Sequence, residues 1–202
     1  MEKDELVAAI VELEWKAFDK VENAGGRADC QNDWNTFSLM RKSQYLAWPE
    51  DLLASFYEDF LEANAKGWNL ITEKYGRMME STVPEEYEAI KEQLPSCSDK
   101  KRAIINQIAE IQVDWMEDFA KEYPNMAGNA RSIRSLTDTP FNTSYETYLK
   151  GELMTYSDRT LGLYGKWIVK LKQENENLAK SIMNNTALLY GYKSLEAAEH
   201  AL

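Results

Sequence analysis

Charged and amide side chains stand at positions where the helical pattern of this chain otherwise places apolar residues. Glu14 lies one helical turn from both Ile10 and Phe18, so it shares their face. An unpaired charge is costly to bury, so such residues are expected to meet one another or a ligand. The same mismatch recurs in three further segments, at Arg41 with Gln44, at Gln112, and at Glu152 with Arg159.

These residue types suit two arrangements, and the sequence leaves both open. Two carboxylates and two guanidiniums balance in charge, and the arginine fork fits a carboxylate through two hydrogen bonds, so a closed salt-bridge network is one arrangement. The other is a polar pocket between the helices of a bundle. In such a pocket Glu14, Glu152 and Tyr156 are the candidate catalytic residues, as acid–base groups. The candidate ligand-binding groups are Arg41, Gln44, Gln112 and Arg159.

A glycine-rich segment, residues 25–33, gathers further polar groups between two helices. Cys30 is a candidate nucleophile, because Arg27 and the following helix N-terminus would favour the thiolate. Without a histidine to accept the proton, a buried and inert thiol is the favoured interpretation. A plain connection that ends in an N-cap explains the glycines and one acidic residue, but not the remaining polar groups. The candidate ligand-binding residues of this segment are Arg27, Asp29, Cys30 and Asp33.

Residues 124–142 form the longest segment without a clear helical period. A loop of this length in a compact domain is more often functional than idle. Arg131 and Arg134 are three positions apart, so on a helical turn they would share a face and hold a carboxylate or phosphate. The equal alternative is that both arginines pair with acidic residues on the surface.

The sequence predicts no metal site and identifies no cofactor. Its single histidine, His200, lies near the end of the sequence, and two cysteines alone do not make a zinc site. A carboxylate site for Mg²⁺ or Mn²⁺ built from Glu14, Asp19, Asp33 and Glu152 is conceivable. The arginines in the same stripes argue against it, because they repel a cation.

The overall charge argues against nucleic acid as a partner. The chain of 202 residues has 23 Lys and Arg against 34 Asp and Glu, a net charge of −11. Few of its cations are therefore available to displace the counterions of nucleic acid. It also lacks an apolar run of roughly 18 residues that would span a bilayer and the basic start of a secretory signal. We expect a soluble cytoplasmic protein that binds neither nucleic acid nor membranes, with a homo-oligomer left open.

Helical periodicity runs through almost the whole chain and predicts an all-α fold. Hydrophobic residues make up 44% of the sequence, including 6 Trp, 11 Tyr and 6 Phe, which is enough to fill one core. We predict a single-domain helical bundle, residues 1–202, of about five to seven helices. The main expected helices cover approximately residues 3–23, 34–48, 50–79, 84–93, 99–123 and 143–167, with a bend or end in the third at Gly67 or Gly76.

Three segments of the chain resemble a known family. Residues 14–37 contain Gly-Gly-Arg-Ala-Asp-Cys-Gln, residues 40–44 are Met-Arg-Lys-Ser-Gln, and residues 147–156 are Thr-Tyr-Leu-Lys-Gly-Glu-Leu-Met-Thr-Tyr. Together they are similar to the bacterial domain-of-unknown-function family numbered 4125, over nearly the whole chain. The resemblance implies a stand-alone bacterial helical domain and no particular activity.

The leading functional hypothesis is a helical protein with a buried pocket lined by arginine and glutamate. Such a pocket would bind a small anionic or zwitterionic molecule, and the protein would be an enzyme if its carboxylates perform acid–base chemistry. The alternative is a non-catalytic interaction or structural module. In that case the same residues close on one another as a buried salt-bridge network, and the sequence does not decide between enzyme and binding protein.

Overall fold

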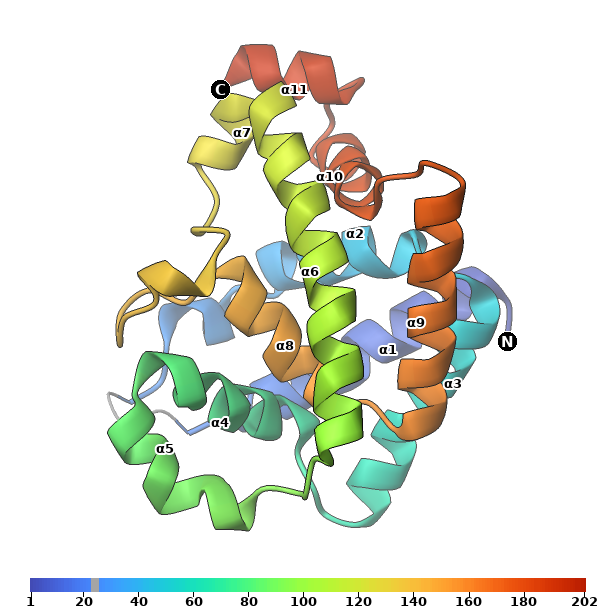
Figure 1. Cartoon of the computed structure of the whole chain (residues 1–202). Coiled ribbons are helices and arrows are strands. Elements are labelled where there is room, and N and C mark those ends of the chain that lie inside the picture. The colour runs from blue at the N-terminus through green and yellow to red at the C-terminus, as the bar shows by residue number, and fades with distance from the viewer. Residues whose placement is uncertain (23–25) are drawn as a thin grey trace.

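The computed structural model describes residues 1–22 and 26–202, which form helices joined by turns and loops, the longest of them between Gly128 and Tyr145 (Figure 1). This confirms the all-α class: the described residues form no strand, and one isolated antiparallel bridge joins Thr139 and Asn142. The helices are α1 (Lys3–Phe18), α2 (Trp34–Leu46), α3 (Glu50–Ala65), α4 (Leu70–Thr82), α5 (Pro84–Ile90), α6 (Asp99–Glu122), α7 (Pro124–Gly128), α8 (Tyr145–Thr155), α9 (Asp158–Gln173), α10 (Leu178–Leu189) and α11 (Leu195–Ala201). Single 3-10 turns lie at Asp29–Asn32, Lys91–Gln93 and Ser135–Thr137.

The described residues thus hold eleven α-helices, and the expectation of five to seven was too low. Polar caps divide the long periodic segments. Between α3 and α4, Gly67 adopts a φ of +68° and the Asn69 side chain accepts hydrogen bonds from the backbone N–H groups of Ile71 and Thr72. Between α8 and α9, Ser157 accepts from the N–H of Thr160. Such caps satisfy the free N–H groups of a new helix, so the chain turns although its apolar pattern continues.

The first helix also ends earlier than expected. α1 stops at Phe18, and the expected end at Asn23 lies outside the described residues. Of the two residues that could cap α2, Asn32 and Asp33, it is Asp33 whose side chain accepts from the N–H of Thr36, at 3.0 Å.

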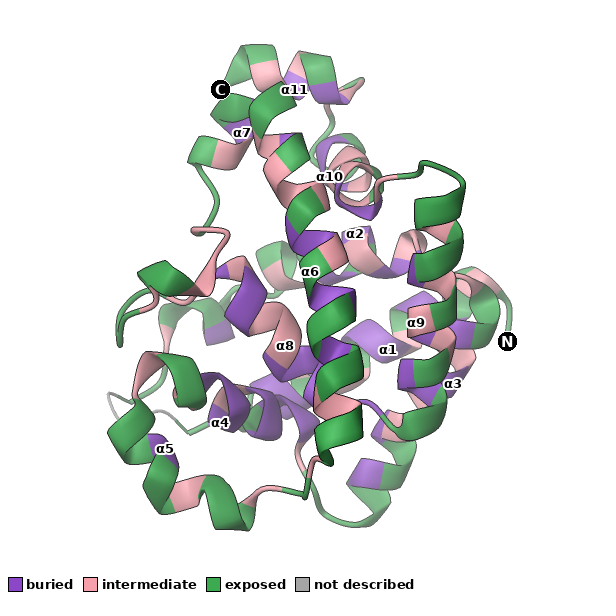
Figure 2. Ribbon diagram, in the orientation of Figure 1, coloured by how far each residue is buried: buried purple, intermediate pink, exposed green. Residues whose placement is uncertain are grey.

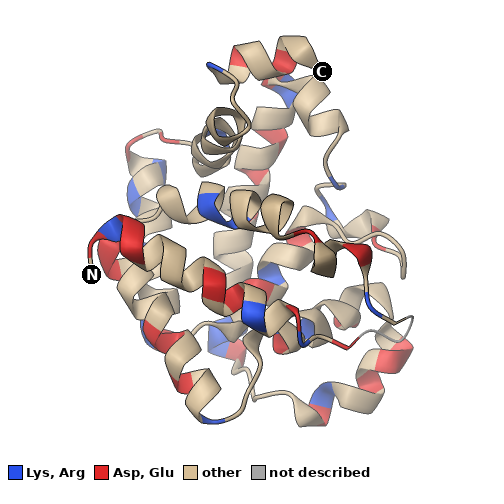
Figure 3. Ribbon diagram, turned by 180° about the vertical axis from the view of Figure 1, so that it is seen from behind, with Lys and Arg blue, Asp and Glu red and all other residues tan. Residues whose placement is uncertain are grey.

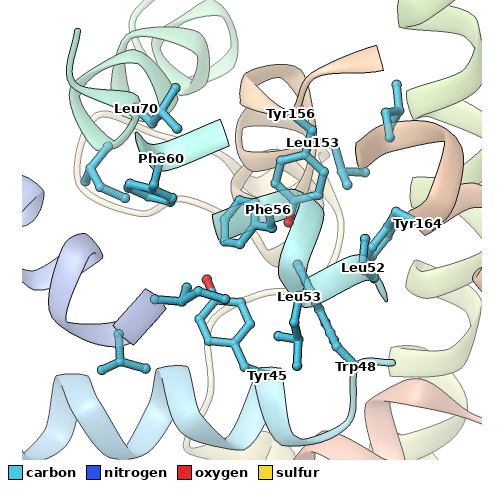
Figure 4. Packing of buried hydrophobic residues seen from close by; sticks show 14 of the residues in the cluster. Tyr45, Trp48, Leu52, Leu53, Phe56, Phe60, Leu70, Leu153, Tyr156 and Tyr164 are labelled. Carbon is cyan, nitrogen blue, oxygen red and sulfur yellow. The ribbon is translucent and has the colours of Figure 1, made fainter. Parts of the chain in front are cut away.

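One large core lies where α1, α2, α3, α8 and α9 converge, and Figure 4 shows aromatic and aliphatic side chains interlocking there. Trp48 is fully buried and contacts the rings of Tyr45, Phe56, Tyr156 and Tyr164 at centroid distances of 5.0–6.2 Å. Aromatic pairs of this geometry stabilise beyond the area that they bury. This core therefore fixes the relative positions of the helices that carry the polar residues singled out above.

The long helix α6 connects this core to a second, smaller apolar cluster at its C-terminal end (Figure 1). There Phe119 and Tyr123 stack at 5.0 Å, and α7, α10 and α11 cover them. α8 packs between α4 and α6 and is largely buried along its length (Figure 2). Its approach to α4 is close, because a Cβ added at Gly151 would lie 2.8 Å from Met78 Cγ.

Charged residues of both signs are distributed over the helices rather than gathered into one basic face, as the rear view shows (Figure 3). Among the described residues, no helix combines the length and the apolar character needed to cross a membrane.

Candidate functional site

Four charged side chains from four different helices meet inside the bundle. They are Glu14 of α1, Arg41 of α2, Lys74 of α4 and Glu152 of α8, with exposures of 1%, 8%, 3% and 5%. Two carboxylates and two cations make this group, which we call the buried charge cluster, electrically neutral. Neutrality is what makes the burial tolerable, since an isolated charge at this depth would be strongly unfavourable.

Arg41 lies at the centre of the buried charge cluster. Its Nε and Nη2 donate to the two oxygens of Glu14 at 2.7 and 2.6 Å, a bidentate contact. Its Nη1 donates to Gln44 Oε1 at 2.9 Å and to Glu152 Oε2 at 3.2 Å, while Nη2 also reaches the hydroxyl of Tyr45. Every guanidinium nitrogen is therefore already bonded within the protein, and none is left over for a ligand.

Glu152 is surrounded by donors on both oxygens. Oε1 accepts from Gln44 Nε2 at 2.9 Å and from the Tyr156 hydroxyl at 3.1 Å, and Oε2 accepts from Lys74 Nζ at 3.2 Å as well as from Arg41. Desolvation acts to raise the pKa of Glu152, but the charges of Arg41 and Lys74 outweigh it and hold that pKa well below its usual range. Glu152 is consequently a permanent anion at neutral pH, unsuited to donate a proton.

The hydroxyl groups around the cluster differ in how firmly they hold their protons. Burial raises the pKa of Tyr156, the expected catalytic tyrosine, well above its usual value. Tyr148 also suffers desolvation, but its hydroxyl accepts from Lys74 Nζ at 2.9 Å, and the charges of Lys74 and Arg41 lower its pKa. Of these two, Tyr148 is the group better suited to exchange a proton.

Lys74 is the member of the cluster that the sequence reasoning missed. It lies three residues after Ile71 and four before Met78, both buried, so the helical spacing that singled out Glu14 also singles out Lys74. A second buried pair, Glu73 with Arg77 at 2.9 Å, was missed as well. Trp68 Nε1 also donates to Glu73, at 2.6 Å.

Gln112 of α6 lies beside the cluster rather than in it. Its Oε1 accepts from the Tyr164 hydroxyl at 2.9 Å, while its Nε2 is buried and has no hydrogen-bond partner among the described residues. The residue lines a cavity of about 120 Å³. The other residues lining this cavity include Gln44, Glu152, Tyr145, Tyr148, Tyr164, Met116, Ile182 and Met183.

Other candidate residues lie away from this centre. Arg159 is exposed and pairs with Glu58 at the surface. Arg134 pairs with Glu110, Asp114 and Glu117 at 2.7–3.4 Å, which is the surface alternative considered for it.

Arg131 is exposed and lies over the ring of Tyr148. Its Nη1 donates to the Thr143 carbonyl at 3.1 Å, and its guanidinium lies 4.7 Å from the centre of the Tyr148 ring. It thus contacts one of the residues that line the cavity by Gln112.

The segment after α1 is held together by its own polar groups. Arg27 donates to Asn32 Oδ1 at 2.8 Å and to Asp19 Oδ1 at 2.6 Å, and Asp33 serves as the cap of α2. Asp29 and Cys30 are exposed, so the expectation of a buried Cys30 thiol was wrong. Gly26 and the 3-10 turn that follows bring this thiol to the surface.

The four carboxylates that the sequence offers as possible metal ligands do not lie together at one site. Asp19 pairs with Arg27 and Asp33 caps α2, whereas Glu14 and Glu152 both bond to Arg41 in the buried charge cluster. Within the described part of the chain, no group of three or more His, Cys, Asp or Glu side chains is arranged to hold a metal ion.

Fold and site together define an all-helical protein organised around a neutral, buried ion-pair network with a small cavity at its edge. The family model described as Protein of unknown function (DUF4125) matches residues 4–200, and the chain belongs to this family. No curated protein and no solved structure matches the chain.

Proposed function

We propose that the protein binds a small zwitterionic or anionic molecule in the cavity beside the buried charge cluster. The observation that carries this proposal is Gln112 Nε2, a buried donor that faces no acceptor among the described residues although it borders a cavity. A buried donor left without an acceptor costs about 1–3 kcal/mol, and a ligand oxygen would recover that cost.

The dimensions and walls of the cavity limit the ligand. A volume of about 120 Å³ is comparable to the roughly 150 Å³ engineered cavity that accepts benzene, so a ligand of about six heavy atoms fits. A carboxylate would accept from Gln112 Nε2. An ammonium group would lie toward the Glu152 side, and the methionine and isoleucine side chains would contact the remaining apolar part.

The proposed activity is ligand binding, and the residues of the buried charge cluster carry out no catalytic step. Glu152 is held ionised and bonded to several donors, and Arg41 has no free nitrogen. The same saturation supports the second candidate function, a structural or interaction module in which the network serves only to hold the helices together.

A set of three probes of nearly equal size tests the proposal by NMR titration: alanine, propionate and propylamine. We expect the two probes with a carboxylate to bind saturably and propylamine, which lacks one, to bind more weakly. Gln112→Leu should weaken the carboxylate probes by about tenfold or more, since about 1.4 kcal/mol corresponds to tenfold.

Gln107→Leu is the matched control, because Gln107 is exposed on the same helix and does not line the cavity. If none of the three probes binds, the binding proposal fails and the structural module stands. If propylamine binds as tightly as propionate, the assignment of the ligand class is wrong.

A further inference from the structure

A second cleft, of about 270 Å³, opens between α4, α6 and α8, and no residue of the buried charge cluster lines it. Its walls hold three cations and one carboxylate, Glu80. The cations are Arg77 from α4, Arg102 from α6 and Lys150 from α8, and the amide of Asn106 lies among them. The cleft is thus richer in donors than in acceptors.

Arg77 is the fixed element of this cleft. Its side chain is 5% exposed, and Nε and Nη2 donate to Glu73 Oε1 at 3.3 and 2.9 Å. Nη2 also donates to the Pro95 carbonyl. Among the described residues nothing accepts from Nη1, so one edge of a positioned and largely desolvated guanidinium remains available.

Arg102 and Lys150 are the other two cations, and each has hydrogen bonds to one residue only. Arg102 uses only Nη1, toward Glu80 at 3.0 and 3.3 Å, and Lys150 Nζ donates to Glu146 at 2.6 Å. Neither Arg102 Nε and Nη2 nor the Asn106 side chain has a hydrogen bond within the described chain. Four side chains from three helices therefore offer unused N–H groups around one space.

We propose that this cleft is a binding site for a tetrahedral oxyanion of the phosphate type. Because each cation already has a carboxylate partner, the attraction comes less from net charge than from unused donors on side chains that line one volume. A phosphate offers several acceptor oxygens to them, and hydrogen bonds between ionised groups are about twice as strong as neutral ones. Glu80 is the group that opposes the ligand, as the one carboxylate in the lining.

Phosphate titration followed by the backbone amides of Asn106 and Gly151 tests this site in the full-length protein. We expect saturable shifts with inorganic phosphate. The double variant Arg102→Gln/Lys150→Gln should weaken binding about tenfold or more, because two charge-assisted contacts are lost. Lys166→Gln, at an exposed lysine of α9 outside the cleft, should leave it unchanged.

A second variant distinguishes a true loss of phosphate binding from a loss caused by misfolding. Glu80→Gln removes the opposing carboxylate and should tighten phosphate binding by roughly threefold or more, a gain that an unfolded protein would not show. Glycerol phosphate distinguishes free phosphate from an organic phosphate as the ligand. If it binds at least as tightly as inorganic phosphate, the ligand is a phosphomonoester. The proposal is overturned if phosphate gives no saturable shift, if acetate binds equally well, or if Glu80→Gln weakens binding. None of these results bears on the cavity beside Gln112.

Discussion

The guanidinium of Arg41 and the carboxylate of Glu14 meet through two parallel hydrogen bonds, 2.6 and 2.7 Å long, at a depth where both residues are more than nine-tenths buried. This contact joins α1 to α2, and Glu152 extends it to α8. The pairing of all guanidinium nitrogens makes Arg41 the residue on which the neutrality and the geometry of the cluster depend.

Arg41→Met should therefore be severely destabilising. The substitution leaves two buried carboxylates with one cation, Lys74, and breaking a buried pair in this way costs about 3–5 kcal/mol. Chemical denaturation of wild type and variant measures the loss in the free energy of unfolding. Arg159→Met is the control, since its pair with Glu58 is exposed and worth less than about 1 kcal/mol. A small loss in Arg41→Met would show that the cluster tolerates an unpaired charge, as a solvated pocket would.

Stability should fall in acid partly through Glu152. Its folded-state pKa lies well below the ordinary value of 4.5, so its contribution is present above that value and is lost as the pH falls toward the folded pKa. We expect the stability difference between wild type and Glu152→Gln to be constant near neutral pH and to shrink below pH 4.5. Urea titrations across this range measure it, and a difference that grows in acid would contradict the assigned sign.

Gly151→Ala should push α8 away from α4. The new methyl group would lie 2.8 Å from Met78 Cγ and 3.1 Å from the backbone oxygen of Lys74, and the backbone cannot simply rotate away. Overpacking of this kind costs about 1–3 kcal/mol. Gly162→Ala, where nothing lies within 4 Å, should instead be neutral or stabilising by up to about 1 kcal/mol. Equal effects of the two variants on the melting temperature would argue against a tight α4–α8 contact.

Two buried glutamines should respond differently to replacement by leucine. Gln31 Nε2 donates to the carbonyls of Phe18 and Val21 at 2.8 and 3.0 Å, so Gln31→Leu should cost about 1–3 kcal/mol. The double variant Gln112→Leu/Tyr164→Phe removes the unpaired donor Nε2 together with both partners of the hydrogen bond from the Tyr164 hydroxyl to Gln112 Oε1. It should leave the free energy of unfolding nearly unchanged. A comparable loss in both would mean that Gln112 Nε2 is satisfied in solution.

The sequence predicted which side chains face inward only where a helix continues without interruption. Within α1 and α2 the 3.6-residue period correctly predicted that Glu14 and Arg41 face inward, because one phase applies along a continuous helix. The same reasoning failed for Arg159. It was assigned to the same helical face as Glu152, but α8 ends at Thr155 and α9 begins after Ser157, so the helical phase restarts between the two residues.

The sequence could not predict which buried side chains bond to one another, because contacts between residues far apart in the chain depend on how the helices pack. The link between Lys74 and Glu152 spans 78 positions, and the donors of Glu152 come from α2, from α4 and from Tyr156, which follows the end of α8. The unpaired state of Gln112 Nε2 likewise follows only from the placement of α2, α8 and α10 around α6.

A double-mutant cycle on Glu14→Gln and Arg41→Met tests the buried charge cluster most directly, because it isolates the coupling between the two side chains from their separate roles. We expect the double variant to be more stable than the sum of the single losses implies, by about 2 kcal/mol or more, within the range seen for contacting residues in one network. Additive losses, within roughly 0.5 kcal/mol, would mean that the two groups are independent and would contradict the closed network.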